Sequence, residues 1–358
     1  MQILTVVGAR PQFIKAAVVS HEIEKYPAVE ELIVHTGQHY DHNMSETFFE
    51  ELAIPQPAFN LGISGGSHAE MTSAMLVELE KVMMEVHPDM VLLYGDTNST
   101  LAGALASAKL HIPIVHVEAG ARTHSMANPE EINRICTDHV ASLLLTCTEE
   151  NLDNLRHEGL EARARFVGDL MYDAFIENLP HAKAPALISI EGGTELPFPQ
   201  NYYYLTCHRE ENTDPQTLNL LLDAMDTLDA PVIYPVHPRN RQKVHQVMEE
   251  HGYGNVLVID PVGYLESLYL IDNARQVVTD SGGLQREAFF AEVKCTTLLD
   301  FEVWPETMVD GRNLLASPNR RSILSAMEAR QHIDPMYKPF GDGHAATKIV
   351  EALAASFG

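Results

Sequence analysis

Short apolar runs alternate with amphipathic segments along most of the chain. In the first half, predicted strands lie at Ile3–Val7, Glu31–Val34, Met90–Tyr94, Ile114–Val117 and Leu143–Cys147. Segments with apolar residues at helical spacing lie between them, at Pro11–Lys25, Met71–Val86, Ser99–Leu110 and Pro129–Ser142. Strands that alternate with helices in this way form parallel sheets that are covered on both faces. The pattern therefore predicts an α/β fold.

The alternation lapses once, between about residues 179 and 200, where prolines and glycines gather. It resumes with predicted strands at Tyr202–Thr206, Val232–Val236, Val256–Ile259, Val277–Thr279 and Thr296–Leu299. We interpret the interruption as a linker region that is entered through a helix at Tyr172–Glu177. The chain is thus expected to form two βα-repeating domains, residues 1–175 and 176–340. A last helix at Ala345–Phe357, within residues 341–358, is expected to pack back on the first domain.

Length and composition agree with this organisation. A chain of 358 residues is long enough for two domains, and 45% hydrophobic with 21% charged residues is typical of globular proteins. The first residues lack the basic segment and cleavage site of a signal peptide, and no apolar run is long enough to span a bilayer. The four cysteines have neither CxxC nor zinc-finger spacing, as expected of reduced thiols. We therefore expect a cytoplasmic protein with no membrane partner.

Net charge narrows the choice of partners further. The chain carries 24 Lys and Arg against 50 Asp and Glu, which gives a formal charge of −26. Such a chain repels nucleic acids and anionic membranes, so we expect neither as a partner. A site for an anionic ligand would have to be built from local positive groups.

Ligands of open α/β sheets bind beyond the carboxyl ends of the strands, so the residues that follow each strand are the candidates. After the first strand, Gly8 permits a tight turn, and Pro11 suits the first position of a helix whose N–H groups face that turn. Arg10 and Lys15 add positive charge, which makes this segment a candidate phosphate site. The alternative is an ordinary connection with two solvated basic residues. The segment matches neither GxGxxG nor a P-loop, which disfavours a dinucleotide or ATP site.

Acidic side chains follow two neighbouring strands of the first predicted sheet. Asp96 comes after Met90–Tyr94, where it could either reach a ligand or cap the following helix. Glu118 ends the next strand, and a buried carboxylate there needs either a partner such as Arg122 or a function. Both side chains are therefore candidates for acid–base chemistry.

The helix that begins at Pro129 adds a third carboxylate. Asn128 and Glu131 fit the N-cap and third positions of a capping box, so Glu131 has a structural explanation. Glu130 has none and is the better functional candidate, and Arg134 lies one turn on and could hold it charged. Because carboxylates in proximity push their pKa values apart, the three acidic residues together could supply an acid and a base.

Two histidines follow strands of the second predicted domain. His208 and Arg209 come directly after Tyr202–Thr206, and His237 follows the next strand. His208 could act as a general acid or stabilise a leaving phosphate. The alternative is an isolated histidine at the end of each strand, without a role in chemistry.

A serine and two glycines begin a later helix of the same domain. Ser281, Gly282 and Gly283 follow the strand at Val277–Thr279, and their N–H groups could cradle an anion. Glu287 lies one turn into the helix and could accept hydrogen bonds from both hydroxyls of a ribose. A flexible glycine loop is the alternative interpretation.

Two other patterns do not predict sites. A His-rich stretch, His35, His39, Asp41 and His42, could bind a metal ion, but a polar loop after a strand explains it, and we predict no metal site. The segment 341–346 matches GxGxxA but has no βαβ unit after it, so it is not a cofactor fingerprint.

Taken together, these motifs resemble the non-hydrolysing UDP-N-acetylglucosamine 2-epimerases. The resemblance runs through nearly the whole chain and is most specific in the segments Gly95–Thr97, Val117–Gly120, Pro129–Arg134, Cys207–Asn212 and Thr279–Gly283. It implies an α/β fold of two Rossmann-like domains with parallel sheets, similar to the GT-B glycosyltransferases, with the active site in the interdomain cleft. It also implies a homodimer that acts on a UDP-sugar and needs no cofactor and no metal.

The resemblance implies a reaction and roles for the candidate residues. UDP is eliminated across C1–C2 of UDP-GlcNAc to leave 2-acetamidoglucal, and its re-addition gives UDP-ManNAc. Catalytic roles are implied for Asp96, Glu118, Glu130 and His208. Substrate contacts are expected from Arg10, Lys15, Arg134, Arg209, His237, Ser281, Gly282, Gly283 and Glu287. Which carboxylate is the base and which is the acid stays open.

The chain departs from the commoner family pattern in three segments. Trp304 stands where the common epimerases carry an arginine, and Gly8–Phe13 reads GARPQF rather than the commoner GTRPE form. Gln38–Asp41 differs from the pattern associated with allosteric UDP-GlcNAc binding. These features resemble the branch that acts on UDP-2,3-diacetamido-2,3-dideoxyglucuronate, which is the alternative substrate. A GT-B glycosyltransferase is the alternative of another class, because it would share the fold and the UDP site.

Overall fold

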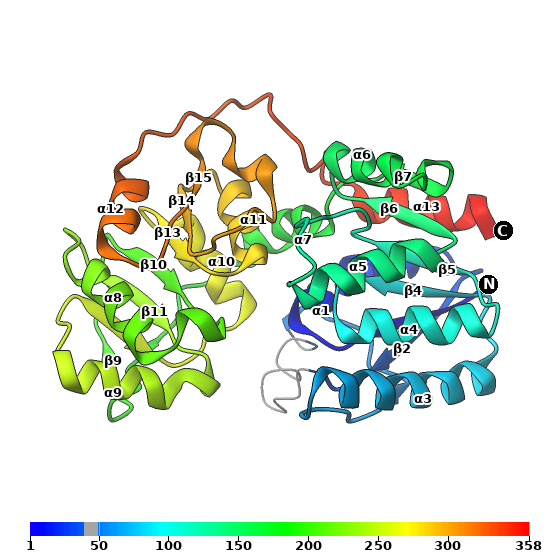
Figure 1. Cartoon of the computed structure of the whole chain (residues 1–358), viewed down its shortest axis with the longest axis horizontal. Helices are drawn as coiled ribbons and strands as arrows, with labels where there is room; N and C mark the ends of the chain where they lie inside the picture. The colour runs from blue at the N-terminus through cyan, green and yellow to red at the C-terminus, as the bar shows by residue number, and fades with distance from the viewer. Residues whose placement is uncertain (39–48, 50, 358) are drawn as a thin grey trace. The chain divides into compact units, whose positions relative to one another are not determined.

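The computed structural model describes residues 1–38, 49 and 51–357. The chain divides into two compact units, which are drawn in Figure 1. The N-terminal unit consists of Met1–Ile176 together with Lys338–Gly358, and the C-terminal unit consists of Glu177–Tyr337. The end of the chain therefore belongs to the same unit as its beginning.

A parallel sheet forms the centre of the N-terminal unit. Its strands are β1 (Gln2–Val7), β2 (Glu30–His35), β3 (Phe59–Asn60), β4 (Met90–Tyr94), β5 (Ile114–Val117), β6 (Leu143–Thr146) and β7 (Ala164–Phe166). They are ordered β3-β2-β1-β4-β5-β6-β7, and neighbouring strands run parallel. The predicted bounds of β4 and β5 are confirmed. The short strand β7 was not predicted, because Arg165 at its centre breaks the apolar pattern.

Helices cover both faces of this sheet. They are α1 (Arg10–Ile23), α3 (His68–Val86), α4 (Asn98–Lys109), α5 (Pro129–Val140), α6 (Glu149–His157), α7 (Leu170–Asn178) and α13 (Ala345–Phe357), with a 3₁₀ turn η1 (Glu161–Arg163). Helices α3, α4 and α5 lie side by side on one face. Helix α1 packs against α13, and Asp173 of α7 accepts a hydrogen bond of 2.7 Å from the N–H of Ala346 in α13.

The C-terminal unit repeats the plan with a second parallel sheet. Its strands are β10 (Tyr203–Thr206), β11 (Val232–Pro235), β12 (Val256–Ile259), β13 (Val277–Thr279), β14 (Cys295–Thr297) and β15 (Asn313–Leu315), in the order β12-β11-β10-β13-β14-β15. Its helices are α8 (Pro215–Asp226), α9 (Arg241–His251), α10 (Tyr264–Asp272), α11 (Gly282–Phe290) and α12 (Arg320–Glu328), with 3₁₀ turns η3 (Glu210–Asn212), η4 (Pro238–Asn240) and η5 (Pro305–Gly311). Helices α8, α9 and α12 pack on one face, and α10 and α11 pack on the other. The predicted α/β fold with parallel sheets is therefore confirmed.

The segment predicted as a linker has structure of its own. It holds a 3₁₀ turn, η2 (Leu179–His181), and an antiparallel pair of two-residue strands, β8 (Leu187–Ile188) and β9 (Glu195–Leu196). Ser189 forms a bridge with Ile259 at the end of β12, and Leu187 is buried in the core of the C-terminal unit. The segment therefore extends the C-terminal unit rather than forming a free connection.

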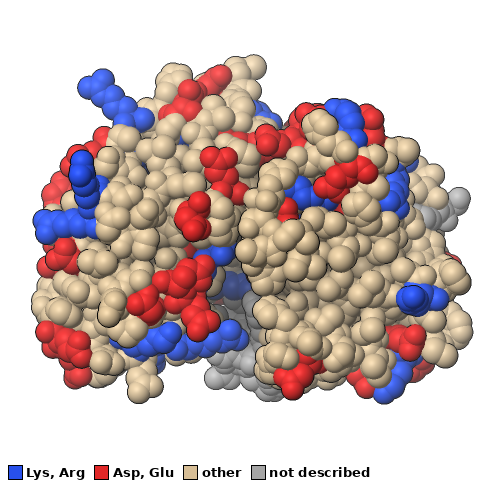
Figure 2. All heavy atoms as spheres, viewed as in Figure 1, with Lys and Arg blue, Asp and Glu red and all other residues tan. Residues whose placement is uncertain are grey.

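Charged side chains are distributed over the surface of both units. Acidic and basic residues are interspersed on the face drawn in Figure 2. Among the described residues, no helix has both the length and the apolar character needed to cross a membrane.

Candidate active site

Glu118 is a buried carboxylate on a strained backbone at the carboxyl end of β5. Its φ is 69°, a left-handed conformation that is costly for a residue other than glycine and is most often found at functional sites. Its carboxylate lies 2.5 Å from Nζ of Lys15, and both side chains are almost inaccessible, at 9% and 4% exposure. Lys15 comes from α1, so the ion pair joins the ends of β1 and β5. This pair replaces the contact with Arg122 that the sequence left open.

Asp96 lies at the end of the neighbouring strand and is held by a second cation. Its carboxylate is ion-paired with Arg134 of α5, and Asn133 donates a hydrogen bond of 2.9 Å to its carbonyl oxygen. Burial lowers the pKa of Arg134, but Asp96, Glu131 and then Glu118 outweigh it and raise that pKa. Asp96 and Glu118 therefore act on one guanidinium from the same edge of the sheet.

Two structural interpretations offered by the sequence do not hold in this region. The cap of α4 is Thr97, whose hydroxyl accepts from the N–H of Thr100, so Asp96 is not the capping residue. Glu131 does not close a capping box, because its carboxylate accepts from the N–H groups of Thr123 and His124, both at 2.9 Å. Asp96 instead pairs with Arg134 of α5, and Glu131 accepts from the loop before α5.

Glu130 stands apart from the other two carboxylates in this structure. Its side chain is exposed in the first turn of α5 and makes no hydrogen bond or ion pair with the described residues. Arg134 is bound to Asp96 and Glu131 instead of Glu130. The predicted convergence therefore involves Asp96 and Glu118, and the role of Glu130 stays a prediction.

The turn after β1 is braced by Gln12, to which the sequence assigned no role. Its side-chain oxygen accepts from the N–H groups of Gly8 and Ala9, at 2.9 and 3.0 Å, and its amide donates to the carbonyl of Tyr94 at 2.8 Å. Arg10 is the first residue of α1 and is partly exposed at this edge. The turn between β1 and α1 is thus fixed to β4, and its phosphate-binding role stays a prediction.

His208 of the C-terminal unit is oriented by a buried aspartate. Its Nδ1 lies 2.8 Å from Oδ1 of Asp280, and the N–H groups of His208 and Arg209 donate to Oδ2 at 2.9 and 2.8 Å. Burial raises the pKa of Asp280, but His208 and these N–H groups outweigh it and lower that pKa to about 2. The imidazole is half exposed, so Nε2 is the nitrogen available to a ligand. The sequence contained Asp280 in a candidate motif but gave it no role.

The start of α11 lies beside this histidine at the end of β13. Ser281 is the N-cap and accepts from the N–H of Leu284 at 3.4 Å, and Gly282 and Gly283 are the first helical residues. A side chain at Gly282 would meet Nε1 of Trp304 at 3.4 Å, and the Trp304 ring stacks on the guanidinium of Arg286 at 4.0 Å. Trp304, at which the chain departs from the commoner family pattern, therefore lies against the start of α11.

The remaining predicted contacts occupy the same unit. His237 caps η4, and its Nδ1 accepts from the N–H of Arg239 at 3.3 Å. The side chain of Arg209 donates to the carbonyl of Asp280 at 3.1 Å, and Glu287 is buried within α11. His208, His237 and Ser281 each follow the carboxyl end of a strand in one parallel sheet, which brings them to one edge.

Two further features do not provide a binding site. Glu118, Cys147 and Asp169 bring possible metal ligands within 4.8 Å of one another, but Glu118 already has Lys15 as its cation. His35 is buried and stacked on Phe13, while His39, Asp41 and His42 lie outside the described residues, as does most of Gln38–Asp41. We therefore assign no metal to either cluster.

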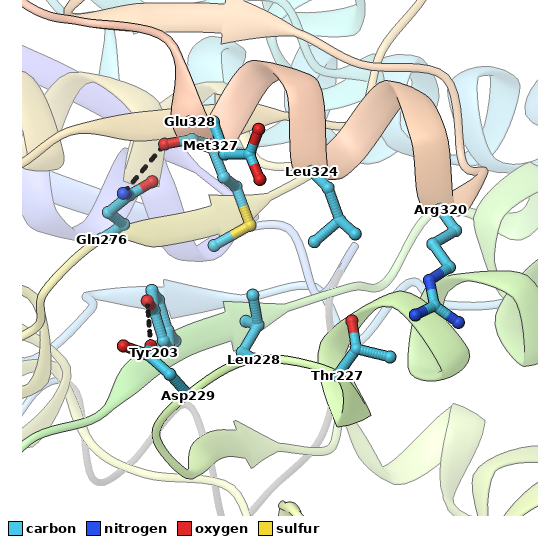
Figure 3. A pocket seen from close by; sticks show the side chains of 9 residues that line it. All are labelled: Tyr203, Thr227, Leu228, Asp229, Gln276, Arg320, Leu324, Met327 and Glu328. Atoms are coloured by element: carbon cyan, nitrogen blue, oxygen red, sulfur yellow. Dashed lines mark hydrogen bonds between the residues drawn. The ribbon is translucent and has the colours of Figure 1, made fainter.

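A pocket of about 510 Å³ opens at the opposite edge of the C-terminal sheet. Tyr203, Asp229 and Gln276, which lie at or before the amino ends of their strands, line it together with residues of α12 (Figure 3). Tyr203 donates to Asp229 at 2.9 Å, and Gln276 donates to the carbonyl of Met327 at 3.0 Å. The pocket contains none of the predicted site residues, and its strand ends are those at which α/β sheets do not bind ligands.

Comparison with known proteins agrees with the motifs. Residues 21–354 match the family described as UDP-N-acetylglucosamine 2-epimerase. The chain is 45% identical to a UDP-N-acetylglucosamine 2-epimerase homolog of Methanococcus maripaludis and 45% identical to the UDP-2,3-diacetamido-2,3-dideoxy-D-glucuronate 2-epimerase of Pseudomonas aeruginosa, in both cases over 99% of each chain. The structure of the Methanocaldococcus jannaschii UDP-GlcNAc 2-epimerase in complex with UDP-GlcNAc and UDP matches with a TM-score of 0.89 and 36% identity, over 99% of this chain and 100% of that one.

Replacing Asp280 with Asn should destabilise the protein most at neutral pH. Because folding lowers the pKa of this carboxyl from 3.8 to about 2, its stabilisation is complete above the unfolded pKa and is lost as the pH falls through the folded one. The shift corresponds to about 2 kcal/mol. Urea unfolding followed by the fluorescence of Trp304, the chain's single tryptophan, reports on the unit that contains Asp280.

The difference in free energy of unfolding between the two proteins should shrink as the pH is lowered from neutral toward the folded pKa of Asp280. A difference that stays constant with pH would show that the carboxylate charge does not stabilise the fold.

Proposed function

The chain belongs to the UDP-N-acetylglucosamine 2-epimerase family, and we propose that it inverts C2 of a UDP-linked N-acetylhexosamine without hydrolysis. The preferred reaction is the interconversion of UDP-GlcNAc and UDP-ManNAc. The observation that carries the proposal is the strained and buried Glu118, paired with Lys15 and near Asp96 at the edge where such sheets bind ligands. A sensor or a simple binding module has no need of such an arrangement.

The first half-reaction removes the C2 proton and the UDP group. An ammonium ion 2.5 Å from Glu118 favours the ionised form of its carboxylate, which suits it to accept a proton. As the C2–H bond breaks, its electron pair forms the C1=C2 bond, and the C1–O bond breaks with its pair on the diphosphate. The products are protonated carboxyl, 2-acetamidoglucal and UDP.

The departing diphosphate requires positive groups, and the C-terminal unit offers them. Asp280 holds Nδ1 of His208, and in its protonated form the ring can donate a hydrogen bond from Nε2 to the leaving oxygen. The first N–H groups of α11, at Gly282 and Gly283, are suited to the phosphates. The proposal thus assigns the sugar chemistry to the N-terminal unit and the nucleotide to the C-terminal unit.

The second half-reaction returns UDP to C1 while C2 takes a proton from the opposite face. The proton must come from a second acid, and Asp96 and Glu130 are the candidates. Asp96 is ion-paired with Arg134, whereas Glu130 is exposed and without a partner among the described residues. Asp96 would have to give up its ion pair with Arg134 to carry a proton, so we propose Glu130 as the residue that delivers it.

A second substrate has a specific observation in its favour. The relative from Pseudomonas aeruginosa, whose name specifies a diacetamido-dideoxyglucuronate, is 45% identical to this chain. The Methanocaldococcus jannaschii UDP-N-acetylglucosamine 2-epimerase is 38% identical. We therefore keep UDP-2,3-diacetamido-2,3-dideoxyglucuronate as the alternative substrate. A GT-B glycosyltransferase remains the alternative of another class, and it would require an acceptor.

Proton NMR of UDP-GlcNAc in D₂O with the protein alone tests the reaction. We expect deuterium at C2 and the growth of UDP-ManNAc, because a proton removed by a carboxylate exchanges with solvent before C2 is protonated again. A glycosyltransferase would leave C2 unlabelled without an acceptor. An unlabelled spectrum with UDP-GlcNAc and labelling with the diacetamido-uronate would replace the substrate, and no labelling of either would reject epimerisation.

Glu118→Gln should abolish exchange at C2 while the affinity for UDP stays within a few-fold. The amide has nearly the shape of the carboxylate but cannot accept the proton, so we expect a loss of at least about 10²-fold in rate. Because the change leaves Lys15 buried beside a neutral amide, the double variant Lys15→Met/Glu118→Gln serves as the folding control. Exchange at the native rate in Glu118→Gln would exclude this residue as the base.

We also propose a homodimer that forms through the exposed face of α3 and α5. Apolar side chains repeat along it, with Ile132 and Val140 on α5 and Val77 and Met84 on α3 exposed by 37% to 60%. The two helices flank α4 on one side of the sheet (Figure 1). Sedimentation equilibrium should give twice the chain mass, and Ile132→Glu with Met84→Glu should give the monomer mass. A monomer in the native chain would reject the proposal.

A further inference from the structure

His116 lies directly behind the loops that carry Asp96 and Glu118. It is the third residue of β5 and is fully buried. Its Nδ1 lies 2.6 Å from Oδ1 of Asp138, and its Nε2 lies 2.7 Å from the carbonyl oxygen of Gly95. The two ring nitrogens thus link the carboxylate of Asp138 to the carbonyl of Gly95 inside the core of the N-terminal unit.

Asp138 of α5 connects this histidine to the loop after β5. Its second oxygen accepts from the N–H of Gly120 at 3.1 Å and from Arg122 at 2.7 Å. Arg122 is held in turn by both oxygens of Glu158, at 2.7 and 2.9 Å. Burial raises the pKa of Asp138, but His116 and Arg122 outweigh it and lower that pKa. Asp138 thus joins His116, the N–H of Gly120 and Arg122 in one buried network.

The network forms hydrogen bonds with two glycines that lie close to the candidate catalytic residues in the sequence. Gly95 precedes Asp96 with φ 61°, and Gly120 follows Glu118 by two residues with φ 79°. A side chain at Gly120 would meet the carbonyl oxygen of Asn151 at 2.2 Å, so only glycine fits at this position. Glycine adopts such a positive φ without strain, so both turns depend on the absence of a side chain.

Gly95 links the network to the ion pair of the site. A Cβ at this position would lie 3.5 Å from both Oε1 of Glu118 and Nζ of Lys15, so Gly95 lies beside the ion pair. The N–H of Gly95 donates to the carbonyl of Val117 at 3.0 Å, and its carbonyl accepts from His116. A displacement of the Gly95 carbonyl would therefore change the surroundings of the ion pair between Lys15 and Glu118.

We propose that His116 and Asp138 are positioning residues for the proton transfers, because they clamp the carbonyl of Gly95 and the N–H of Gly120 and so hold Asp96 and Glu118 in place. The inference rests on the proposed function. Neither residue touches the substrate in this account. Their effect is on the geometry of the two carboxylates, and an error of about 1 Å in such geometry can cost about 10²-fold in rate.

Two variants of His116 separate its two hydrogen bonds. In His116→Asn the amide nitrogen takes the position of Nδ1 and keeps the bond to Asp138, whereas in His116→Gln it takes the position of Nε2 and keeps the bond to Gly95. We expect the rate of C2 exchange per folded molecule to fall about 10²-fold in His116→Asn and to be largely rescued in His116→Gln, with KM within a few-fold in both. Equal native rates in the two folded variants would overturn the proposal.

A matched control distinguishes positioning from general destabilisation. Asp173→Asn removes another buried carboxylate of the same unit, which accepts from Ala346 at the start of α13 and lies outside the site. It should lower the midpoint of thermal unfolding and leave the rate of C2 exchange unchanged. A rate loss in Asp173→Asn that matches the loss in His116→Asn at equal stability would show that both act only through stability.

A structure of His116→Asn separates this inference from the proposed function. We expect the Gly95 carbonyl to be displaced and the contact between Lys15 and Glu118 to lengthen. If these changes occur while the native chain exchanges C2 in neither sugar, the positioning role stands and the reaction is wrong. If the native chain is active and the variant keeps both contacts, the positioning role is wrong.

Discussion

The buried ion pair between Lys15 and Glu118 is the constraint on which the N-terminal unit's site depends. A buried charge that loses its partner costs about 3–5 kcal/mol, so α1 and the end of β5 must stay together. The left-handed backbone at Glu118 adds about 1–3 kcal/mol of strain, which the surrounding contacts have to offset. Gly95 lies beside both charged groups, and its φ of 61° is a conformation that favours glycine. A left-handed backbone at a residue other than glycine, as at Glu118, is found most often at functional sites.

Both units contain the same arrangement, in which a buried aspartate binds Nδ1 of a histidine and also accepts from a backbone N–H. In the N-terminal unit Asp138 binds His116 and the N–H of Gly120, and in the C-terminal unit Asp280 binds His208 and its N–H. The difference lies at Nε2. That of His116 is bonded to a carbonyl in the core, whereas the ring of His208 is half exposed. One pair is therefore suited to hold backbone, and the other is suited to meet a ligand.

The elements with strong patterns could be predicted, and those defined by neighbours could not. The strands β4, β5, β12 and β13 keep their predicted bounds because buried strands of parallel sheets are continuous apolar runs. The short edge strands β7 and β15 have no such run, since each is defined by pairing with one neighbour. The antiparallel pair of β8 and β9 was not predicted, because it lies in a segment rich in proline and glycine.

For the site, the residue types and strand ends were predictable but the partners were not. Asp96 and Glu118 were candidates because they follow buried strands. Nothing in their spacing indicated that Lys15 and Arg134, more than 35 residues away in sequence, would neutralise them. His116 was missed altogether, although a single histidine inside an apolar strand is a signal that a buried polar group needs a partner.

The sequence by itself determined the periodicity of the chain, hence two parallel sheets, and the chemical groups that follow each strand. These properties are local, because hydrophobic spacing and strand–turn–helix order act over a few residues. Only the tertiary structure decided which charges meet, which glycines are clamped and which histidine is left open to a ligand. Ion pairs and buried hydrogen bonds depend on distances across the sheet, and these are settled when distant segments pack together.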